Sequence, residues 1–177
     1  MKTGRLGARN VEVKARVADP AAVEDRARRL ATEGPFELEQ DDTFFRCATG
    51  RLKLRELAPD RGELIFYERP DAQGPKVSRY TIAPTTSPAA LREALEQAWG
   101  VVGRVRKHRR VYLAGQTRIH LDRVEGLGDF VELEVVLEAS QAAEVGDAVA
   151  RRLLGELGIR EADLVAGAYL DLLTPVR

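Results

Sequence analysis

A strict alternation of apolar and fully ionised side chains constrains the possible folds of this chain more than any other feature. Residues 10–17 (NVEVKARV) alternate without a break, residues 51–55 (RLKLR) repeat the pattern, and residues 130–137 (FVELEVVL) carry carboxylates on one face. A period of two predicts β-strands whose one face is apolar. The chain therefore contains several strands that each present a charged face opposite an apolar one.

The charged faces carry like charges at close spacing. With a rise of about 3.3 Å per residue, Arg51, Lys53 and Arg55 fall within about 14 Å on one face, and Glu132 and Glu134 lie about 7 Å apart. The simplest interpretation of one such strand is a face exposed to water. Repulsion between gathered like charges favours a ligand instead, because solvent gives no reason to collect them.

The rest of the sequence predicts a single α+β domain over residues 1–177. Turn residues separate further strand-like stretches and bring the expected total to about eight strands; these stretches are 36–47, 63–69, 77–82, 101–113 and 117–124. Helices are expected to start at Pro20 and Pro88, each after a capping Asp or Ser, and to span 141–157 and 161–173.

Composition excludes several classes of protein. The 28 basic and 28 acidic residues balance, so nucleic acid is not an expected partner. One cysteine excludes a disulfide framework or a cysteine-rich zinc site, and two histidines exclude a site built on several imidazoles. No apolar run approaches the roughly 20 residues that cross a bilayer and the N-terminus has no signal-peptide pattern, so we expect a cytoplasmic protein with no membrane partner.

The two faces of the strands together predict a barrel with a charged interior. Amphipathic helices must bury their apolar stripes, and the apolar strand faces are the only large surface available. If helices cover the outside, a closed eight-stranded antiparallel β-barrel turns its charged faces inward. Unpaired buried charge is too costly for a dry core. We therefore expect a wet tunnel in which bases hold a polyanion and carboxylates hold a hard divalent cation.

Short motifs occur in an order that resembles the CYTH domain family, also called triphosphate tunnel metalloenzymes. The first strand carries Asn-x-Glu-x-Lys where the family has Glu-x-Glu-x-Lys, and the resemblance extends over roughly residues 10–173. The motifs are Asn10-x-Glu12-x-Lys14, Lys53-x-Arg55, Arg69, Lys107-x-Arg109, Asp122, and the loop Gly126-Leu127-Gly128-Asp129-Phe130 leading into Glu132-x-Glu134.

The resemblance implies a role for each matching residue. Metal ligands for Mg²⁺ or Mn²⁺ would be Glu12, Asp122, Glu132 and Glu134. The triphosphate would be bound by Lys14, Lys53, Arg55, Arg69, Lys107 and Arg109, and, on the expectation that they also face inward, by Arg79 and Arg118. The catalytic set would be Lys14, Glu12 and Asp122. Asn10 departs from the family pattern, and a neutral side chain there would weaken or remove a second metal.

The resemblance implies one of two reactions, and the glycine loop is most similar to the class IV adenylyl cyclases. Such an enzyme converts ATP to cyclic AMP and pyrophosphate. The alternative is a triphosphatase that hydrolyses tripolyphosphate, thiamine triphosphate or a nucleoside triphosphate. A further alternative, suggested by Asn10, is a non-catalytic sensor of polyphosphate or nucleotide. The expected partner is thus a small triphosphate-containing molecule, and a homodimer is possible.

Five other residues are given structural interpretations. His120 shares a face with Arg118 and Asp122 and is expected to line the tunnel, whereas His108 faces outward; neither is assigned a catalytic role. Lys76 is expected to be exposed in a loop, while Cys47 and Trp99 are expected to pack.

Overall fold

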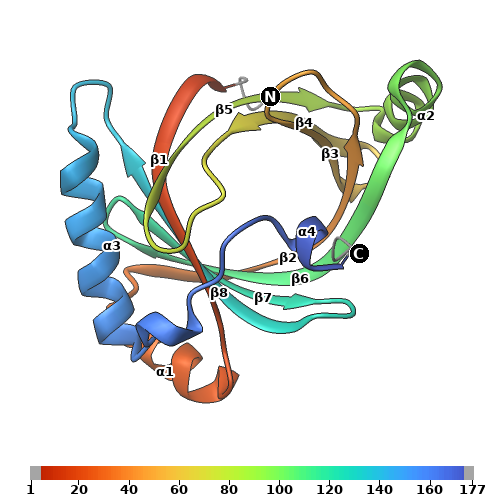
Figure 1. Cartoon of the computed structure of the whole chain (residues 1–177). Coiled ribbons are helices and arrows are strands. Elements are labelled where there is room, and N and C mark those ends of the chain that lie inside the picture. The colour runs from red at the N-terminus through yellow and green to blue at the C-terminus, as the bar shows by residue number, and fades with distance from the viewer. Residues whose placement is uncertain (1–4, 174–177) are drawn as a thin grey trace.

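Eight antiparallel strands close into a barrel in this computed structural model, which describes residues 5–173 (Figure 1). The order around the barrel is β1-β5-β4-β3-β2-β6-β7-β8, so the first and last strands pair and no edge is left between them. The predicted α+β barrel is confirmed, while the two ends of the predicted domain, 1–4 and 174–177, lie outside the described residues. The strands are β1 (Arg5–Arg16), β2 (Glu33–Phe45), β3 (Arg51–Ala58), β4 (Arg61–Glu68), β5 (Lys76–Thr85), β6 (Val101–Ala114), β7 (Thr117–Val124) and β8 (Gly128–Leu137).

The helices lie against the outside and one end of this barrel. They are α1 (Pro20–Leu30), α2 (Pro88–Trp99), α3 (Ala143–Leu157) and the short α4 (Tyr169–Leu173). At the start of α1 the side chain of Asp19 accepts a hydrogen bond from the backbone N–H of Ala22 at 3.1 Å, as the sequence predicted. None of these described helices has the length and apolar character needed to cross a membrane.

The helix expected over 161–173 is divided in two. A 3₁₀ turn covers Glu161–Asp163 and α4 begins only at Tyr169. Gly167 between them has φ of 78°, a left-handed conformation that ends a helix. The interruption matters because it brings the 167–171 segment over one end of the barrel (Figure 1).

The pairing of β1 with β8 shows how sequence alternation becomes two different surfaces. Their ladder runs without a shift from Arg9–Leu137 to Arg16–Phe130. Val11 and Val13 point outward and belong to the largest hydrophobic cluster with residues of α1 and α3. The intervening charged residues point into the barrel. Helix burial thus decides which strand face is the interior, and the charged one is enclosed.

Helix α3 packs through small residues. Gly146, Ala150, Leu153 and Leu157 are buried on its inner face. Val145, next to Gly146 in the sequence, is 46% exposed. The smaller side chains allow the helix to approach the barrel closely, which a larger residue at the contact would prevent.

Three expectations about single residues are wrong. Cys47 is exposed because β2 ends at Phe45 and the cysteine lies in the following turn. Trp99 is 52% exposed because it is the last residue of α2. Lys76 is buried, since it begins β5 and points into the barrel instead of lying in the preceding loop.

Candidate active site inside the barrel

Two rows of charged residues cross the barrel interior, each formed by direct partners on neighbouring strands. The first row runs through Lys76, Glu12, Glu134 and Arg118, on β5, β1, β8 and β7. Arg118 donates to Glu134 at 3.1 Å and is about a quarter exposed. Bases thus flank the two carboxylates at both ends of this row.

The second row lies one step further along the barrel and contains Lys14, Glu132 and His120. Lys14 Nζ lies 3.5 Å from Glu132 Oε2, and His120 Nδ1 lies 3.8 Å from Glu132 Oε1 and 3.9 Å from an oxygen of Glu134. Ligand atoms of His120, Glu132 and Glu134 all fall within 4.8 Å of one another. Of the described residues, these three form the one group with the spacing to hold a metal ion.

Glu12 belongs to the same acidic cluster. Burial and the neighbouring charge of Glu132 raise its pKa, although Arg69 Nε lies 2.9 Å from Glu12 Oε1 and lowers it in part. The pKa of Glu132 is well below its ordinary value, because Lys14 and Arg109 outweigh the effect of burial. A divalent cation would remove the repulsion among these carboxylates.

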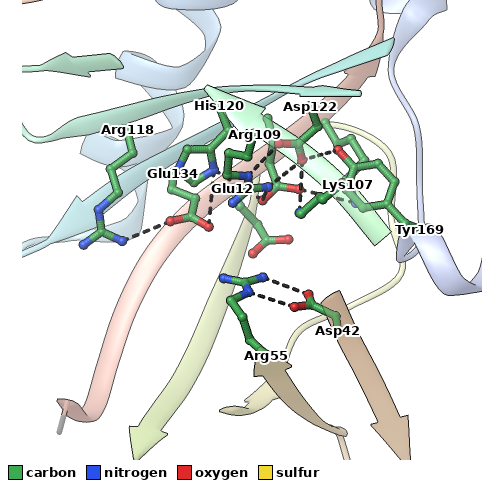
Figure 2. A network of polar contacts seen from close by, with 12 residues as sticks. Glu12, Asp42, Arg55, Lys107, Arg109, Arg118, His120, Asp122, Glu134 and Tyr169 are labelled. Atoms are coloured by element: carbon green, nitrogen blue, oxygen red, sulfur yellow. Dashed lines mark hydrogen bonds and ion pairs between the residues drawn. The ribbon is translucent and has the colours of Figure 1, made fainter. Parts of the chain in front are cut away.

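Asp122 has a different environment from the other carboxylates. Its oxygens accept hydrogen bonds from Arg109 at 2.6 Å twice, from Lys107 at 3.1 Å and from the Tyr169 hydroxyl at 2.9 Å (Figure 2). Burial by itself would raise the pKa of Asp122, but Arg109 and Lys107 outweigh this effect and hold the pKa well below its ordinary value. The carboxylate is therefore ionised. It neutralises and orients two bases, and its expected role as a metal ligand stays a prediction.

Asp42 plays the same part on β2, two strands away from the β7 strand of Asp122, and was missed in the sequence. It accepts from Lys53 at 2.7 Å. It also accepts from Arg55 at 2.8 and 2.9 Å, as Figure 2 shows. Burial raises its pKa, but Arg55 and Lys53 lower it far below the ordinary value. Asp41 precedes it and points outward to Arg104, so only the pairing of β2 with β3 identifies which aspartate is inside.

Burial lowers the pKa values of three lysines of the interior, namely Lys53, Lys107 and Lys76. Burial lowers the pKa of Lys107 to about 7, and Arg109 contributes in the same direction. Burial lowers the pKa of Lys76 to about 8, with Arg69 contributing. Lys107 and Lys76 would gain protons when an anion enters, because negative charge nearby favours the protonated form.

Arg79 does not join the other predicted bases, and its assignment to the site is wrong. It lies opposite Arg9 on the outer face and is exposed. On β5 the inward positions are Lys76, Ser78 and Tyr80, so the charged residue at 79 shares parity with the outward Val77. The other predicted bases of the site, by contrast, all point inward.

The C-terminal segment covers one end of the tunnel and contacts its bases. The carbonyl oxygen of Gly167 accepts from Lys14 at 3.4 Å and from Arg69 at 2.9 Å. The Tyr169 ring lies under Lys14, 4.0 Å from Nζ to the ring centroid. The Tyr169 hydroxyl also donates to Asp122, which lies 47 residues away in the chain. This separation explains why the sequence alone does not indicate that Tyr169 belongs to the site.

An opening in the barrel wall leads to the same bases. β2 pairs with β3 only from Phe45–Leu52 to Asp41–Glu56, whereas β2 continues to pair with β6 beyond that point. A cavity of about 410 Å³ lies where the two strands separate, lined in part by Gln40, Lys107 and Leu57–Pro59. The Oε1 atom of Gln40 is buried, and no described residue donates a hydrogen bond to it.

Comparisons with known proteins agree with this architecture. The CYTH domain family model matches residues 8–169. The PH1012 protein of Pyrococcus horikoshii is 24% identical with a TM-score of 0.81, over 92% of this chain and 98% of that one. A Vibrio parahaemolyticus protein provisionally described as an adenylate cyclase is 20% identical with a TM-score of 0.74, over 96% and 99%.

A more distant structure has the same fold with a different named activity. The Pct1 RNA triphosphatase of Schizosaccharomyces pombe, in complex with the Spt5 CTD, is 11% identical with a TM-score of 0.52, over 87% of this chain and 82% of that one. At these identities the solved structures establish the fold alone. No curated protein matches the chain with significance.

Proposed function

The chain belongs to the CYTH domain family, and on that premise we propose that it is a divalent-metal-dependent enzyme acting on a nucleoside triphosphate. Conversion of ATP to cyclic AMP and pyrophosphate is the leading reaction. Members of this family are adenylate cyclase-like enzymes or triphosphatases that depend on metal ions. The proposal therefore concerns which triphosphate is bound and which bond is broken.

One observation carries the proposal: an acidic metal-binding group lies among buried bases inside a closed barrel. Phosphate chains need positive charge on several oxygens, and a hard cation needs carboxylates beside them. Few other ligands require both kinds of charge at once. The enclosed site also strengthens each electrostatic contact by excluding bulk water.

Each set of residues has a distinct task in this proposal. Glu12, Glu132 and Glu134 would hold Mg²⁺ or Mn²⁺, which when bound neutralises phosphate charge as a Lewis acid. Arginines bind phosphate through bidentate forks and lysines as point charges. Asp122 keeps two of the bases in place. The phosphate-binding bases are Lys14, Lys53, Arg55, Arg69, Lys107, Arg109 and Arg118.

The opening between β2 and β3 favours a nucleotide over bare tripolyphosphate. Its volume of about 410 Å³ suits a nucleoside, and Lys107 on its lining can bind the adjoining phosphate. The lining combines the apolar stretch Leu57–Pro59 with polar and charged residues that suit a sugar and a base: Glu39, Gln40, Asp41, Glu56 and Arg106. The unpartnered Oε1 of Gln40 can accept a hydrogen bond from the amino group of adenine. In the cyclase reaction the ribose 3′-hydroxyl releases its proton to solvent as its oxygen bonds to the α-phosphorus. The bond from the α-phosphorus to the oxygen that bridges it to the β-phosphorus breaks, and pyrophosphate leaves with that oxygen.

A binding-only sensor is the second candidate, and Asn10 favours it. Asn10 is buried on the inner face where the family has a glutamate, and its Oδ1 has no hydrogen-bond partner among residues 5–173. A neutral side chain there reduces the charge available to metal ions. Such a protein would bind ATP or tripolyphosphate without turning it over.

Phosphorus NMR with parallel nucleotide chromatography, on ATP and tripolyphosphate with Mg²⁺ or Mn²⁺, tests the proposal. Cyclic AMP with pyrophosphate supports the cyclase, orthophosphate identifies a triphosphatase, and binding without turnover identifies a sensor. Glu132→Gln should lower turnover at least 100-fold, while Glu138→Gln, at an exposed position just after the end of β8, should not. Absence of both binding and turnover would refute all three forms of the proposal.

A further inference from the structure

We propose that His120 is a direct ligand of the metal ion in the tunnel and that its nitrogen makes this protein prefer Mn²⁺ and later first-row ions over Mg²⁺. The inference rests on the proposed function, since it concerns the same site. It adds a ligand and a metal preference that the sequence motifs do not contain.

The spacing of the donor atoms fits one shared ion. His120 Nδ1 lies 3.8 Å from Glu132 Oε1 and 3.9 Å from Glu134 Oε1, which is too long for hydrogen bonds. Two ligands with metal bonds of about 2.1 Å lie roughly 3.0 to 4.2 Å apart in common geometries. Both distances from His120 Nδ1 fall in this range, and all three donor atoms lie within 4.8 Å of one another, so a small side-chain adjustment suffices for one shared ion.

The second, independent observation is the unsatisfied state of the imidazole. His120 is 4% exposed, and its Nδ1 is buried without a hydrogen-bond partner in the part of the chain that the structure describes. Buried polar atoms almost always have a partner. The position of the unpartnered Nδ1 of His120 between two carboxylates therefore fits a bound cation. A cation supplies the interaction that no neighbouring side chain provides.

Each carboxylate divides its two oxygens between the imidazole and a base. Glu132 directs Oε2 to Lys14 at 3.5 Å, and Glu134 directs Oε2 to Arg118 at 3.1 Å. Both Oε1 atoms face His120, with Arg109 Nη2 also 3.5 Å from that of Glu132. The bases orient both carboxylates so that their Oε1 atoms face His120, and the contact from Arg109 to Glu132 Oε1 is a long one that an ion can share.

A nitrogen ligand changes which ion the site prefers. Mg²⁺ takes oxygen ligands and loses its water reluctantly, whereas imidazole suits the later first-row ions, with affinity rising from Mn²⁺ through Co²⁺ and Ni²⁺. Asn10, which stands where a glutamate would strengthen binding of a hard ion, shifts the balance in the same direction. The neutral imidazole replaces a negative oxygen that Mg²⁺ would need.

Pulsed EPR of the full-length protein loaded with substoichiometric Mn²⁺ tests the inference directly. We expect nitrogen modulation from a bound imidazole in the wild-type protein and its loss in His120→Asn. His108 is the only other histidine, points outward and contacts Glu37 and Glu39, so His108→Asn is the matched control and should keep the signal. Calorimetry should show at least a tenfold loss of Mn²⁺ affinity in His120→Asn and less than a threefold loss for Mg²⁺.

The outcomes separate this inference from the proposed function. Mn²⁺ binding without nitrogen modulation, or with modulation unchanged in His120→Asn, would overturn the histidine ligand and leave a carboxylate site standing. Failure of the wild-type protein to bind Mn²⁺ or Mg²⁺, with or without tripolyphosphate, would overturn both. If His120→Asn does not fold, wild-type protein labelled with ¹⁵N-histidine decides, since the coupling must then change to that of ¹⁵N.

Discussion

Replacing Asp42 with asparagine should separate the electrostatics of the tunnel from those of the surface. The change leaves Lys53 and Arg55 buried without the carboxylate that accepts from them at 2.7 to 2.9 Å. Removing one partner of a buried ion pair costs about 3–5 kcal/mol, because the remaining charge is uncompensated. For a domain of this size we expect the Tm to fall by roughly 6–20 °C.

Asp41→Asn is the matched control, because the neighbouring aspartate faces outward. Its partners Arg104 and Arg106 have side chains that are 40% and 55% exposed, and ion pairs at such positions contribute less than about 1 kcal/mol. Urea unfolding of both variants measures the difference. Equal losses of stability in Asp41→Asn and Asp42→Asn would refute the assignment of Asp42 to a desolvated interior.

The response of Asp42→Asn and of the wild-type protein to tripolyphosphate tests whether Lys53 and Arg55 bind the phosphates. The phosphate chain should supply Lys53 and Arg55 with the negative charge that Asp42→Asn removes. Saturating tripolyphosphate should therefore stabilise Asp42→Asn more than it stabilises the wild-type protein, and narrow the gap between them. If the ligand raises the Tm of both by the same amount, Lys53 and Arg55 do not meet the phosphates.

Two further predictions concern the outer packing and the protonation of the tunnel. Gly146→Ala should destabilise the protein by about 1–3 kcal/mol, because the new Cβ would lie 2.6 Å from Val11. On the same helix, a Cβ at Gly155 would have no described atom within 4 Å, so Gly155→Ala should stabilise the protein by up to about 1 kcal/mol. Equal Tm values for the two variants would contradict the close approach of α3 to the barrel. The pKa of Lys107 near 7 leaves that lysine largely neutral at pH 8, so a bound polyanion that raises the pKa should cause proton uptake on tripolyphosphate binding. Calorimetry in two buffers of different ionisation enthalpy measures the uptake, which Lys107→Arg should reduce; no uptake at pH 8 in the wild-type protein would show that Lys107 does not contact the ligand.

Alternation in the sequence was informative because each strand carries two chemically distinct faces. Lys53-x-Arg55 and Glu132-x-Glu134 could be assigned to common faces from spacing alone, and the structure places them so. The need of the helices for an apolar surface then predicted that the charged faces point inward. Both inferences depend on local strand geometry and on burial of apolar area, and both of these can be predicted from the order of residues in the chain.

Alternation does not identify the inward face of a strand with mixed pattern. On β5 the inner positions include the uncharged Ser78 and Tyr80, so the charge of Arg79 predicts the wrong inward face for this strand. The turn residues before β5 likewise predict a loop at Lys76, which is the first residue of the strand. Adjacent Asp41 and Asp42 are equivalent until β2 pairs with its neighbours. These cases required the register, which is a property of two strands together.

A barrel of charged strands covered by helices follows from the amino-acid sequence alone, because period-two alternation and amphipathic helices permit few other ways to bury the apolar faces. The contacts between side chains inside the barrel are visible only in the three-dimensional structure. They include His120 beside Glu132 and Glu134, Asp122 with Tyr169, and the Gly167 carbonyl with Lys14. The physical reason is that spacing along one strand defines faces but not neighbours. Neighbours follow from strand register, barrel closure and the interruption at Gly167, which join residues far apart in the chain.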